Sequence, residues 1–528
     1  MLLVKQVNLP PETDFDNLIP CVSRALKVPP REIISVRLYR KSIDARHKNN
    51  IVFCCSFLVE VKNENTVLKR CKNAEIYAEK PYVWKTAQSA VRPVVVGFGP
   101  AGMFAALTFA RAGLKPIVLE RGQDVDTRIL EVQQFFEGGR LNTESNVQFG
   151  EGGAGTFSDG KLNTGIKDSR CREVLKVFNA FGAQDKILYE AKPHIGTDVL
   201  VGVVKNIRNE IIKLGGEVKF GCRMDKIIID GDRVWSVSVS QKGENYNINC
   251  EYLVLALGHS ARDTFQMLKN IGIKMERKPF SVGTRIEHRQ EDINKALYGD
   301  FASHKNLPAA DYKLAVHLPS GRGVYTFCMC PGGEVINASS EEGAVAVNGM
   351  SYSAREGTNA NSAVLVDVRP EDLNGDDILA GIFFQREIEQ RAYKIGGGKV
   401  PVCTVGDLLG TEFVGTDGVN PTVKPDTVKT DIYNVLPRFV ADSIKQALPL
   451  LAKKLNGFDN GAAVLTFPET RSSSPVRILR DENYVSLNLN GLYPAGEGAG
   501  YAGGIMSAAV DGMRVAEKII DSINGENI

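Results

Sequence analysis

The chain has 528 residues, 43% of them hydrophobic, and its 64 Lys and Arg against 62 Asp and Glu give a formal net charge of +2. This composition excludes wholesale disorder, and near-neutrality excludes a protein whose whole surface coats nucleic acid or an anionic membrane. The 51 glycines show no collagen-like period, so their clustering is the informative feature.

Residues 1–90 read as a small separate domain. Short apolar runs predict strands at 4–8, 34–40 and 51–61 and helices at 15–26 and 65–71, an order that resembles a ferredoxin-like α+β sandwich. Up to Arg92 the chain has 16 Lys and Arg and 9 Asp and Glu, a net charge of 16 − 9 = +7, which leaves the remainder at 48 − 53 = −5. A nucleic-acid or acidic-partner surface is one interpretation of the basic segment 37–48; a basic hairpin that docks on the acidic body is favoured.

Residues 93–122 form a complete dinucleotide-binding unit. A β-branched run at 94–96 is followed by the sequence GFGPAG, an apolar helical pattern, and a second strand that ends at Glu120. Gly97 permits the tight turn, Gly99 lets the backbone approach a pyrophosphate, and Gly102 lets the helix pack on the strand. Pro100 and Ala101 open the helix, whose N-terminus attracts phosphate. Glu120, 18 residues after Gly102, is placed to accept hydrogen bonds from a ribose.

The unit 94–122, with its Glu120-Arg121-Gly122 ending, resembles the FAD-binding unit of the two-dinucleotide-fold flavoproteins, whose FAD domain is like that of glutathione reductase. The resemblance implies an α/β domain with a parallel sheet of Rossmann type, and it places Arg121 in the cofactor site. It further implies that residues 214–227, with Met224, frame the adenine. The apolar strand at 251–258 resembles the family's late strand, which ends here in Gly258.

A second glycine-rich stretch occupies residues 148–162. It nearly spells a phosphate-binding P-loop, but Leu162 stands where Ser or Thr would hold Mg²⁺, so an ATPase is disfavoured. The favoured interpretation is a loop wrapped on the flavin through Gly152 and Gly153, with Lys161 near the redox edge. A flexible surface loop is the alternative.

Residues 283–465 mix short β-like runs with a helical pattern at 378–395 and predict an inserted α+β substrate or cap domain. Arg471 and Ser472 are weak candidates for the substrate cleft. Further polar candidates for facing the flavin are Arg285, His288, Arg322, Tyr325 and Arg355, although a solvated or structural role is the favoured interpretation for each one alone.

The ten cysteines include no CxxC, which disfavours a thioredoxin-like dithiol and fits a reducing compartment. In a strand, Cys328 and Cys330 would point to one face, so a vicinal thiol pair is conceivable. Two small apolar residues in a half-buried strand are the favoured interpretation.

The C-terminal cluster at 491–504 contains a literal GxGxxG, but too few residues follow it for a second strand and a ribose acid. It resembles instead the closing flavoprotein motif. The resemblance implies that Gly496 and Glu497 lie near the ribityl chain and that Gly503, Gly504 and Ile505 approach the flavin pyrimidine edge. The FAD domain is therefore discontinuous, with residues 91–282 as its first part and 466–528 as its last.

Together these motifs resemble the uncharacterised bacterial FAD-dependent dehydrogenases related to aminoacetone-oxidase-like flavoproteins. The resemblance implies FAD as cofactor and an oxidoreductase that transfers hydride or electrons to or from a small-molecule substrate. NAD(P)H or another donor or acceptor would visit transiently. A flavin-containing binding or regulatory protein, whose basic lobe engages nucleic acid or a protein, is the alternative. No catalytic residue and no metal site can be assigned, and without a signal or membrane span a cytoplasmic protein is expected.

Overall fold

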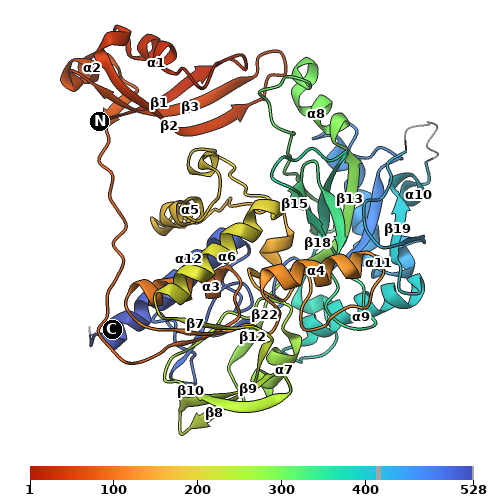
Figure 1. Cartoon of the computed structure of the whole chain (residues 1–528). Helices are drawn as coiled ribbons and strands as arrows, with labels where there is room; N and C mark the ends of the chain where they lie inside the picture. The colour runs from red at the N-terminus through yellow and green to blue at the C-terminus, as the bar shows by residue number, and fades with distance from the viewer. Residues whose placement is uncertain (412–417, 526–528) are drawn as a thin grey trace.

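The computed structural model describes residues 1–411 and 418–525. Figure 1 shows a small N-terminal domain at one end, connected by a long extended segment to a larger body. The body combines a parallel α/β part with a part built on a broad, mostly antiparallel sheet.

The N-terminal domain has the order β-α-β-β-α-β, and its four-stranded antiparallel sheet has the strand order β2-β3-β1-β4. This element order is that of the ferredoxin-like motif. The first helix begins at Ile19 rather than at residue 15, because Pro20 needs no N–H partner in a first turn. Its elements are β1 (Leu2–Leu9), α1 (Ile19–Leu26), β2 (Ile33–Asp44), β3 (Val52–Val61), α2 (Glu64–Arg70) and β4 (Ala74–Ile76).

The α/β part is built on a five-stranded parallel sheet with the order β23-β11-β5-β6-β7. The last strand of the chain therefore completes a sheet begun 400 residues earlier, as the discontinuous domain requires. Its elements are β5 (Val94–Val96), α3 (Pro100–Arg111), β6 (Ile117–Leu119), α4 (Val125–Phe136), α5 (Arg170–Ala180), α6 (Thr197–Lys213), β7 (Glu217–Lys219), β8 (Cys222–Asp230), β9 (Arg233–Gln241), β10 (Glu244–Asn249), β11 (Leu253–Leu255), α7 (Arg262–Asn270), β23 (Leu492–Pro494) and α12 (Ile505–Ile523).

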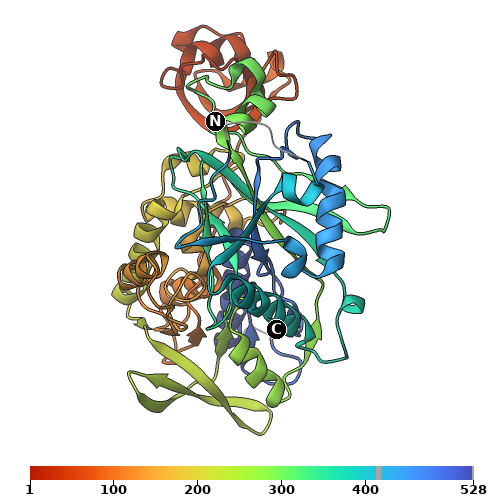
Figure 2. The same ribbon diagram turned by 90° about the vertical axis from the view of Figure 1, so that its right-hand side faces the viewer.

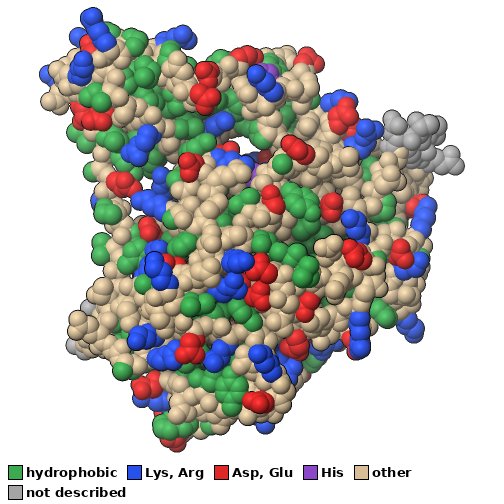
Figure 3. All heavy atoms as spheres, in the orientation of Figure 1, with side chains coloured by type: hydrophobic (Ala, Val, Ile, Leu, Met, Phe, Trp, Pro, Cys, Tyr) green, Lys and Arg blue, Asp and Glu red, His purple; other side chains and the backbone are tan. Residues whose placement is uncertain are grey.

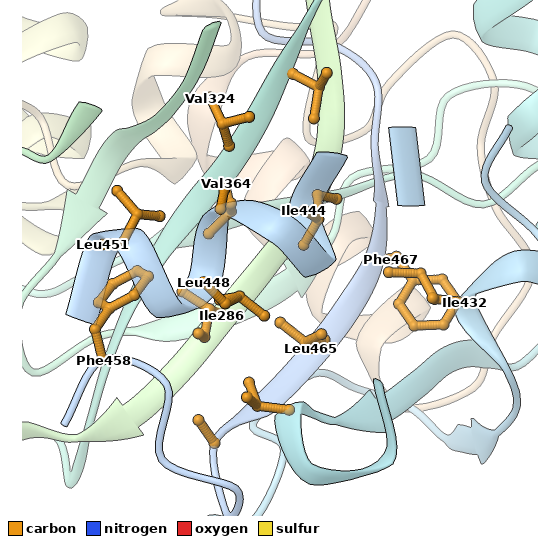
Figure 4. Close-up of a cluster of buried hydrophobic side chains, with 14 of the residues drawn as sticks. Ile286, Val324, Val364, Ile432, Ile444, Leu448, Leu451, Phe458, Leu465 and Phe467 are labelled. Atoms are coloured by element: carbon orange, nitrogen blue, oxygen red, sulfur yellow. The ribbon is translucent and has the colours of Figure 1, made fainter. Parts of the chain in front are cut away.

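The inserted part is built on a seven-stranded sheet with the order β14-β15-β18-β13-β21-β19-β20. Side chains of β13, β18, β21 and α11 form a continuous apolar core, shown in Figure 4. Its elements are β12 (Met275–Arg277), β13 (Phe280–Arg289), α8 (Gln290–Tyr298), β14 (Ala315–His317), β15 (Gly323–Cys330), β16 (Glu334–Asn337), β17 (Val347–Met350), β18 (Asn359–Val368), α9 (Ala380–Gly396), β19 (Val400–Thr404), α10 (Val405–Leu409), β20 (Thr427–Lys429), α11 (Arg438–Ala452), β21 (Val464–Glu469) and β22 (Val476–Ile478).

Residues 77–93 have no regular secondary structure and run along the α/β part as a strap. The Tyr82 hydroxyl donates to Glu517 on α12, and the Trp84 indole donates to Glu173 on α5 over 3.1 Å. The Ala87 amide donates to the Ala112 carbonyl over 2.8 Å. The connection is therefore fixed to the body along its length.

The N-terminal domain docks on the body through its basic hairpin (Figure 2). The Lys41 amide donates to Tyr189 over 2.7 Å, and the Ala191 amide donates back to the Lys41 carbonyl over 2.8 Å. Ile51 is buried in the core of the inserted part. Beside this contact, Figure 3 shows a hollow between the domain and the body, with Lys and Arg side chains at its edge.

Candidate cofactor site

A cavity of about 460 Å³ lies beyond the ends of β5 and β11, between the α/β part and the inserted part. All three glycine clusters contribute to its wall, together with residues 326–329 of β15. Among the residues singled out from the sequence, those on the wall are Gly97, Gly99, Pro100, Ala101, Glu120, Arg121, Gly153, Lys161, Met224, Gly258, Arg471, Ser472, Glu497, Gly503, Gly504 and Ile505.

The turn at residues 97–102 has the geometry that a pyrophosphate needs. Gly97 has φ +95°, and a Cβ there would lie 2.3 Å from the Ala256 carbonyl oxygen. Helix α3 starts at Pro100 with no side-chain cap at Gly99, so its first amides point to the cavity without a protein acceptor. A Cβ at Gly102 would lie 1.9 Å from the Gly97 carbonyl oxygen, so only glycine allows this turn to close.

The three glycine clusters touch one another. A Cβ on Gly153 would lie 3.0 Å from Gly99 Cα, and a Cβ on Gly155 would lie 3.2 Å from a side-chain carbon of Ile505. Arg128 fixes the loop at 146–151. This side chain is fully buried and donates to the carbonyls of Asn146, Val147 and Glu151. The second cluster is therefore fixed against the first and the third.

Gly102, Gly152 and Gly496 do not line the cavity and serve packing instead. A Cβ on Gly152 would lie 2.1 Å from the Thr156 hydroxyl, and a Cβ on Gly496 would lie 2.6 Å from the Ala101 Cβ. They support the wall from behind.

Glu120 organises backbone at the sheet edge. Its carboxylate accepts hydrogen bonds from the amides of Phe98 (2.7 Å), Gly122 (2.9 Å) and Gly150 (2.9 Å), so it ties the fingerprint to the second glycine cluster. Arg121 lies on the cavity wall with its guanidinium paired to Glu144 and Asp263. Oε2 of Glu120 accepts a single hydrogen bond from the described residues, so it can accept a second one from a ligand.

Glu497 presents an unused acceptor to the cavity. Within residues 1–411 and 418–525, no donor hydrogen-bonds to its carboxylate, and burial raises its pKa to about 7 although Lys278 opposes the shift. Close by, α12 begins at Ile505 after Gly504 without a side-chain cap. A free carboxyl and a second helix N-terminus facing one cavity fit a ligand with both hydroxyl and acceptor groups.

The weak cleft candidates Arg471 and Ser472 lie on the wall, but Arg471 faces a buried ion cluster. Its guanidinium donates to Glu389 over 3.1 and 2.9 Å, and Glu389 also accepts two hydrogen bonds from Arg262. Ser472 donates to the Ser281 carbonyl over 2.8 Å. In this structure Glu389 of α9 therefore joins Arg471 to Arg262 of α7, and Arg471 serves the junction between the two parts.

Lys161 and Arg355 meet at Asp159, which the sequence reasoning missed. The buried Asp159 lies 3.0 Å from the Lys161 ammonium and also pairs with the Arg355 guanidinium and the Ser351 hydroxyl. Burial raises the pKa of Asp159, but the two cations outweigh burial and lower it to about 2. Asp159 and Arg355 lie almost 200 positions apart in the sequence, so no local pattern reveals their pairing.

The other candidates for facing the flavin have structural partners. Arg285 is fully buried and lies 2.6 Å from Glu469. His288 contacts the Phe458 carbonyl at 2.9 Å, Arg322 pairs with Asp372, and Tyr325 donates to Ser281. Of these residues' partners, Glu469 lies on the cavity wall, and burial raises its pKa to about 7 against the opposing charge of Arg285.

Two family models match the chain. One, described as "FAD-dependent protein, C-terminal domain-like", matches residues 279–472, and a domain of unknown function, DUF8436, matches residues 1–60. An uncharacterised protein of Clostridium beijerinckii is 48% identical over 530 residues and covers 99% of both chains.

Solved structures that resemble the chain include the flavin-dependent brominase Bmp2, with 13% identity, a TM-score of 0.39 and coverage of 83% and 80% of the two chains. A flavoprotein/dehydrogenase from Cytophaga hutchinsonii has 12% identity, a TM-score of 0.38 and coverage of 83% and 80%. Scores this low assign neither fold nor function.

FAD is the cofactor of this chain. The family model is that of an FAD-dependent protein, and the cavity fits the group through its glycine cradle, its two uncapped helix N-termini and the open Glu497 carboxylate. The described residues contain no cluster of metal-ligating side chains. They also include no helix long and apolar enough to cross a membrane.

Proposed function

The chain belongs to the family of the Clostridium beijerinckii protein, and on this premise we propose that it is an FAD-dependent oxidoreductase acting on a small molecule. The observation that carries the proposal is the single cavity wall on which the dinucleotide fingerprint, Lys161, Glu469 and Glu497 lie together. The fingerprint supports cofactor binding, and the ionisable groups support chemistry beside it.

FAD supplies a two-electron acceptor and donor when it is bound. The amides at the start of α3 would hold its phosphates, Glu120 would accept from its ribose, and Glu497 would accept from the ribityl chain. The Lys161 ammonium, fixed by Asp159 and the Met329 carbonyl, would favour the negatively charged reduced form. Two carboxyls with pKa values near 7, Glu469 and Glu497, can hold or release a proton at neutral pH.

We propose that the molecule exchanging electrons with FAD has no binding domain of its own in the described residues. The described residues contain one five-stranded parallel sheet and one complete dinucleotide fingerprint, so no second nucleotide domain supports a resident nicotinamide. A transient NAD(P)H, molecular oxygen or a quinone would exchange electrons from the cavity side, and the protein would work in the cytoplasm.

The test is anaerobic reduction of the purified chain, followed at the flavin absorbance. A flavin spectrum that a panel of small-molecule donors bleaches and an acceptor restores supports the proposal. Protein that is colourless, and stays colourless after incubation with FAD, refutes it.

The position of the N-terminal domain bears on the alternative function, that of a binding or regulatory flavoprotein. Its Lys41 contacts residues 189–191, and Lys192, the next residue, lies on the cavity wall. This contact favours a domain that borders the substrate entrance. Removal of residues 1–76 would leave the strap in place. An altered KM for a small donor would support a domain that borders the substrate entrance. Unchanged turnover with loss of a nucleic-acid or protein partner would support the binding or regulatory flavoprotein.

A further inference from the structure

Cys328 and Cys330 lie at the end of β15 where that strand meets the cavity. Cys328 is on the cavity wall and half-buried, whereas Cys330 is fully buried just behind it. The Cys330 thiol lies close enough to interact with the Cys328 side chain, and its Sγ donates to the Cys328 carbonyl oxygen over 3.3 Å. An accessible thiol backed by a buried one is the arrangement of an attacking and a resolving cysteine.

A β-bulge produces this arrangement. Phe327 pairs with Ala363 and Cys330 with Asn361, so β15 has one more residue than β18 between the two pairs. Cys328 adopts φ +42°, a left-handed conformation that is uncommon for residues other than glycine. Bulges re-aim side chains, and strained backbone of this kind concentrates at functional sites. Regular alternation, on which the sequence prediction relied, does not describe this strand end.

The surroundings of the thiols are positively charged. Arg285 Nη1 lies 2.9 Å from the Cys328 carbonyl oxygen and 3.9 Å from the Cys330 Sγ, and Lys161 donates to the Met329 carbonyl between the two cysteines. The hydrogen bond from Cys330 lowers the pKa of the Cys328 thiol, and the charges of Lys161 and Arg285 add to the effect against burial. A thiolate is the nucleophilic form of cysteine, so Cys328 is the reactive member.

We propose that Cys328 and Cys330 are a redox-active dithiol that exchanges two electrons with FAD and serves a small thiol or disulfide substrate. The inference rests on the proposed function, which it deepens by naming the substrate class. In the oxidising direction both S–H bonds break, one S–S bond forms, and the two electrons and two protons pass to FAD, which becomes reduced.

Exchange with substrate balances in the same way. A substrate dithiol attacks the Cys328–Cys330 disulfide, first forming a mixed disulfide at Cys328. Its second thiol then attacks that bond, which releases the oxidised substrate and restores both cysteine thiols. The reverse sequence reduces a disulfide substrate with electrons from reduced FAD.

The experiment compares the FAD-loaded wild-type chain with Cys328→Ser, Cys330→Ser and the control Cys403→Ser. Cys403 lies in β19 of the same sheet, is buried, and has its pKa raised to about 12 by burial, so it is an inert thiol. Each protein is oxidised with diamide, freed of reagent and titrated anaerobically with dithionite. Peptide masses after denaturation and alkylation report the state of the two thiols separately.

The inference predicts four electrons per FAD for the wild type and Cys403→Ser, two for the disulfide and two for the flavin, and two electrons for either other variant. The 328–330 peptide should carry an internal disulfide after diamide. Dithiothreitol should bleach the flavin at least about tenfold faster in the wild type than in Cys328→Ser, because the exchange route requires that thiol.

Two results separate the inference from the function on which it rests. A wild-type chain that holds FAD, takes two electrons and keeps both thiols alkylatable refutes the dithiol and leaves the oxidoreductase standing. A chain that does not bind FAD refutes both. If a serine variant fails to fold, the wild-type electron count and peptide mass still decide the question.

Discussion

Replacing Glu389 by Gln removes the negative charge that lies between Arg262 and Arg471 at the junction of the two parts of the body. The three side chains are almost fully buried, with exposed fractions of 0%, 2% and 5%. The Glu389 carboxylate accepts four hydrogen bonds from the two guanidiniums, at 2.8 to 3.1 Å, and one from Thr470 at 2.5 Å. An amide of the same size keeps one acceptor oxygen and turns an N–H₂ group towards a cation.

Removing one partner of a buried pair costs about 3–5 kcal/mol, because the remaining charge stays buried. We expect about 3 kcal/mol, the low end, since Glu341 still pairs with Arg262 at 2.8 Å. For an inserted part of the size that the family model matches, residues 279–472, this loss corresponds to a fall in Tm of about 6–12 °C. The assay is a thermal scan of the FAD-loaded chain with flavin fluorescence and intrinsic fluorescence recorded together.

Glu341→Gln is the matched control. Glu341 pairs with Arg262 and Arg386 but is 26% exposed, so its loss should cost about 1 kcal/mol or less, a fall in Tm of about 2–4 °C. The reasoning would be refuted if the two variants melted at the same temperature, or if Glu389→Gln melted within about 2 °C of the wild type.

The pH dependence gives an independent check on the same residue. Burial raises the pKa of Glu389, but Arg262 and Arg471 outweigh burial and hold the pKa well below its ordinary value of 4.5. A depressed carboxyl pKa stabilises the folded state above the unfolded pKa and loses that contribution as pH falls below it. The difference in Tm between wild type and Glu389→Gln should therefore narrow as pH falls below 4.5 and stay constant above about 6.

Three further predictions concern the cavity. Gly97→Val should lower the affinity for FAD at least about hundredfold, because its Cβ would lie 2.3 Å from the Ala256 carbonyl oxygen. Gly202→Ala should retain FAD, because an added Cβ there meets no atom within 4 Å apart from its chain neighbours and its own helix backbone; the ratio of flavin to protein absorbance measures both. Glu497→Gln should leave the apoprotein Tm unchanged at pH 4 and raise it at pH 8. Burial raises the folded pKa of Glu497 from 4.5 to about 7, so keeping the carboxylate buried costs stability that grows from about pH 4.5 and is fully present above about pH 7; equal Tm differences at both pH values would contradict this. Lys161→Met should lower the flavin potential by on the order of 30 mV in a potentiometric titration, because the cation stabilises the reduced form; an unchanged potential would place Lys161 away from the redox edge.

The parts of the site that the sequence predicted are those whose chemistry is local. The fingerprint at 97–102 needs a strand, three glycines and a helix within thirty residues, and each constraint is set by backbone sterics. Residues 496–504 of the C-terminal glycine cluster follow β23, which pairs with β11 in the same parallel sheet as the fingerprint strand β5. The prediction placed the end of α1 correctly at Leu26 but its start at residue 15 instead of Ile19. The short β4 was not predicted, because a three-residue strand carries no periodic signal.

The features of the site that could not be predicted depend on pairs of residues far apart in the sequence. Nothing near Asp159 in sequence indicates Arg355, and nothing near Arg471 indicates Glu389, since the partners come from segments that lie far apart in the chain. The β-bulge at Cys328 is of the same kind: it depends on the register between β15 and β18, not on the residues of β15 alone. Charged candidates chosen by residue type were therefore mostly satisfied by partners inside the protein.

The topology explains how an inserted part can still supply groups to the cavity. The chain leaves the α/β part through β12 and β13 and returns through β21 and β22. Strand β12 pairs with β22 and strand β13 with β21, both antiparallel, with Met275 opposite Ile478 and Gly283 opposite Glu469. Because exit and return coincide, the parallel sheet can resume with β23 beside β11 without distortion. The same pairing fixes the Arg285–Glu469 ion pair at the cavity wall, and Arg285 in turn holds the Cys328 carbonyl. A change in the register of β13 and β21 would therefore displace the thiols relative to the glycine cradle, so the insertion point itself couples the two halves of the site.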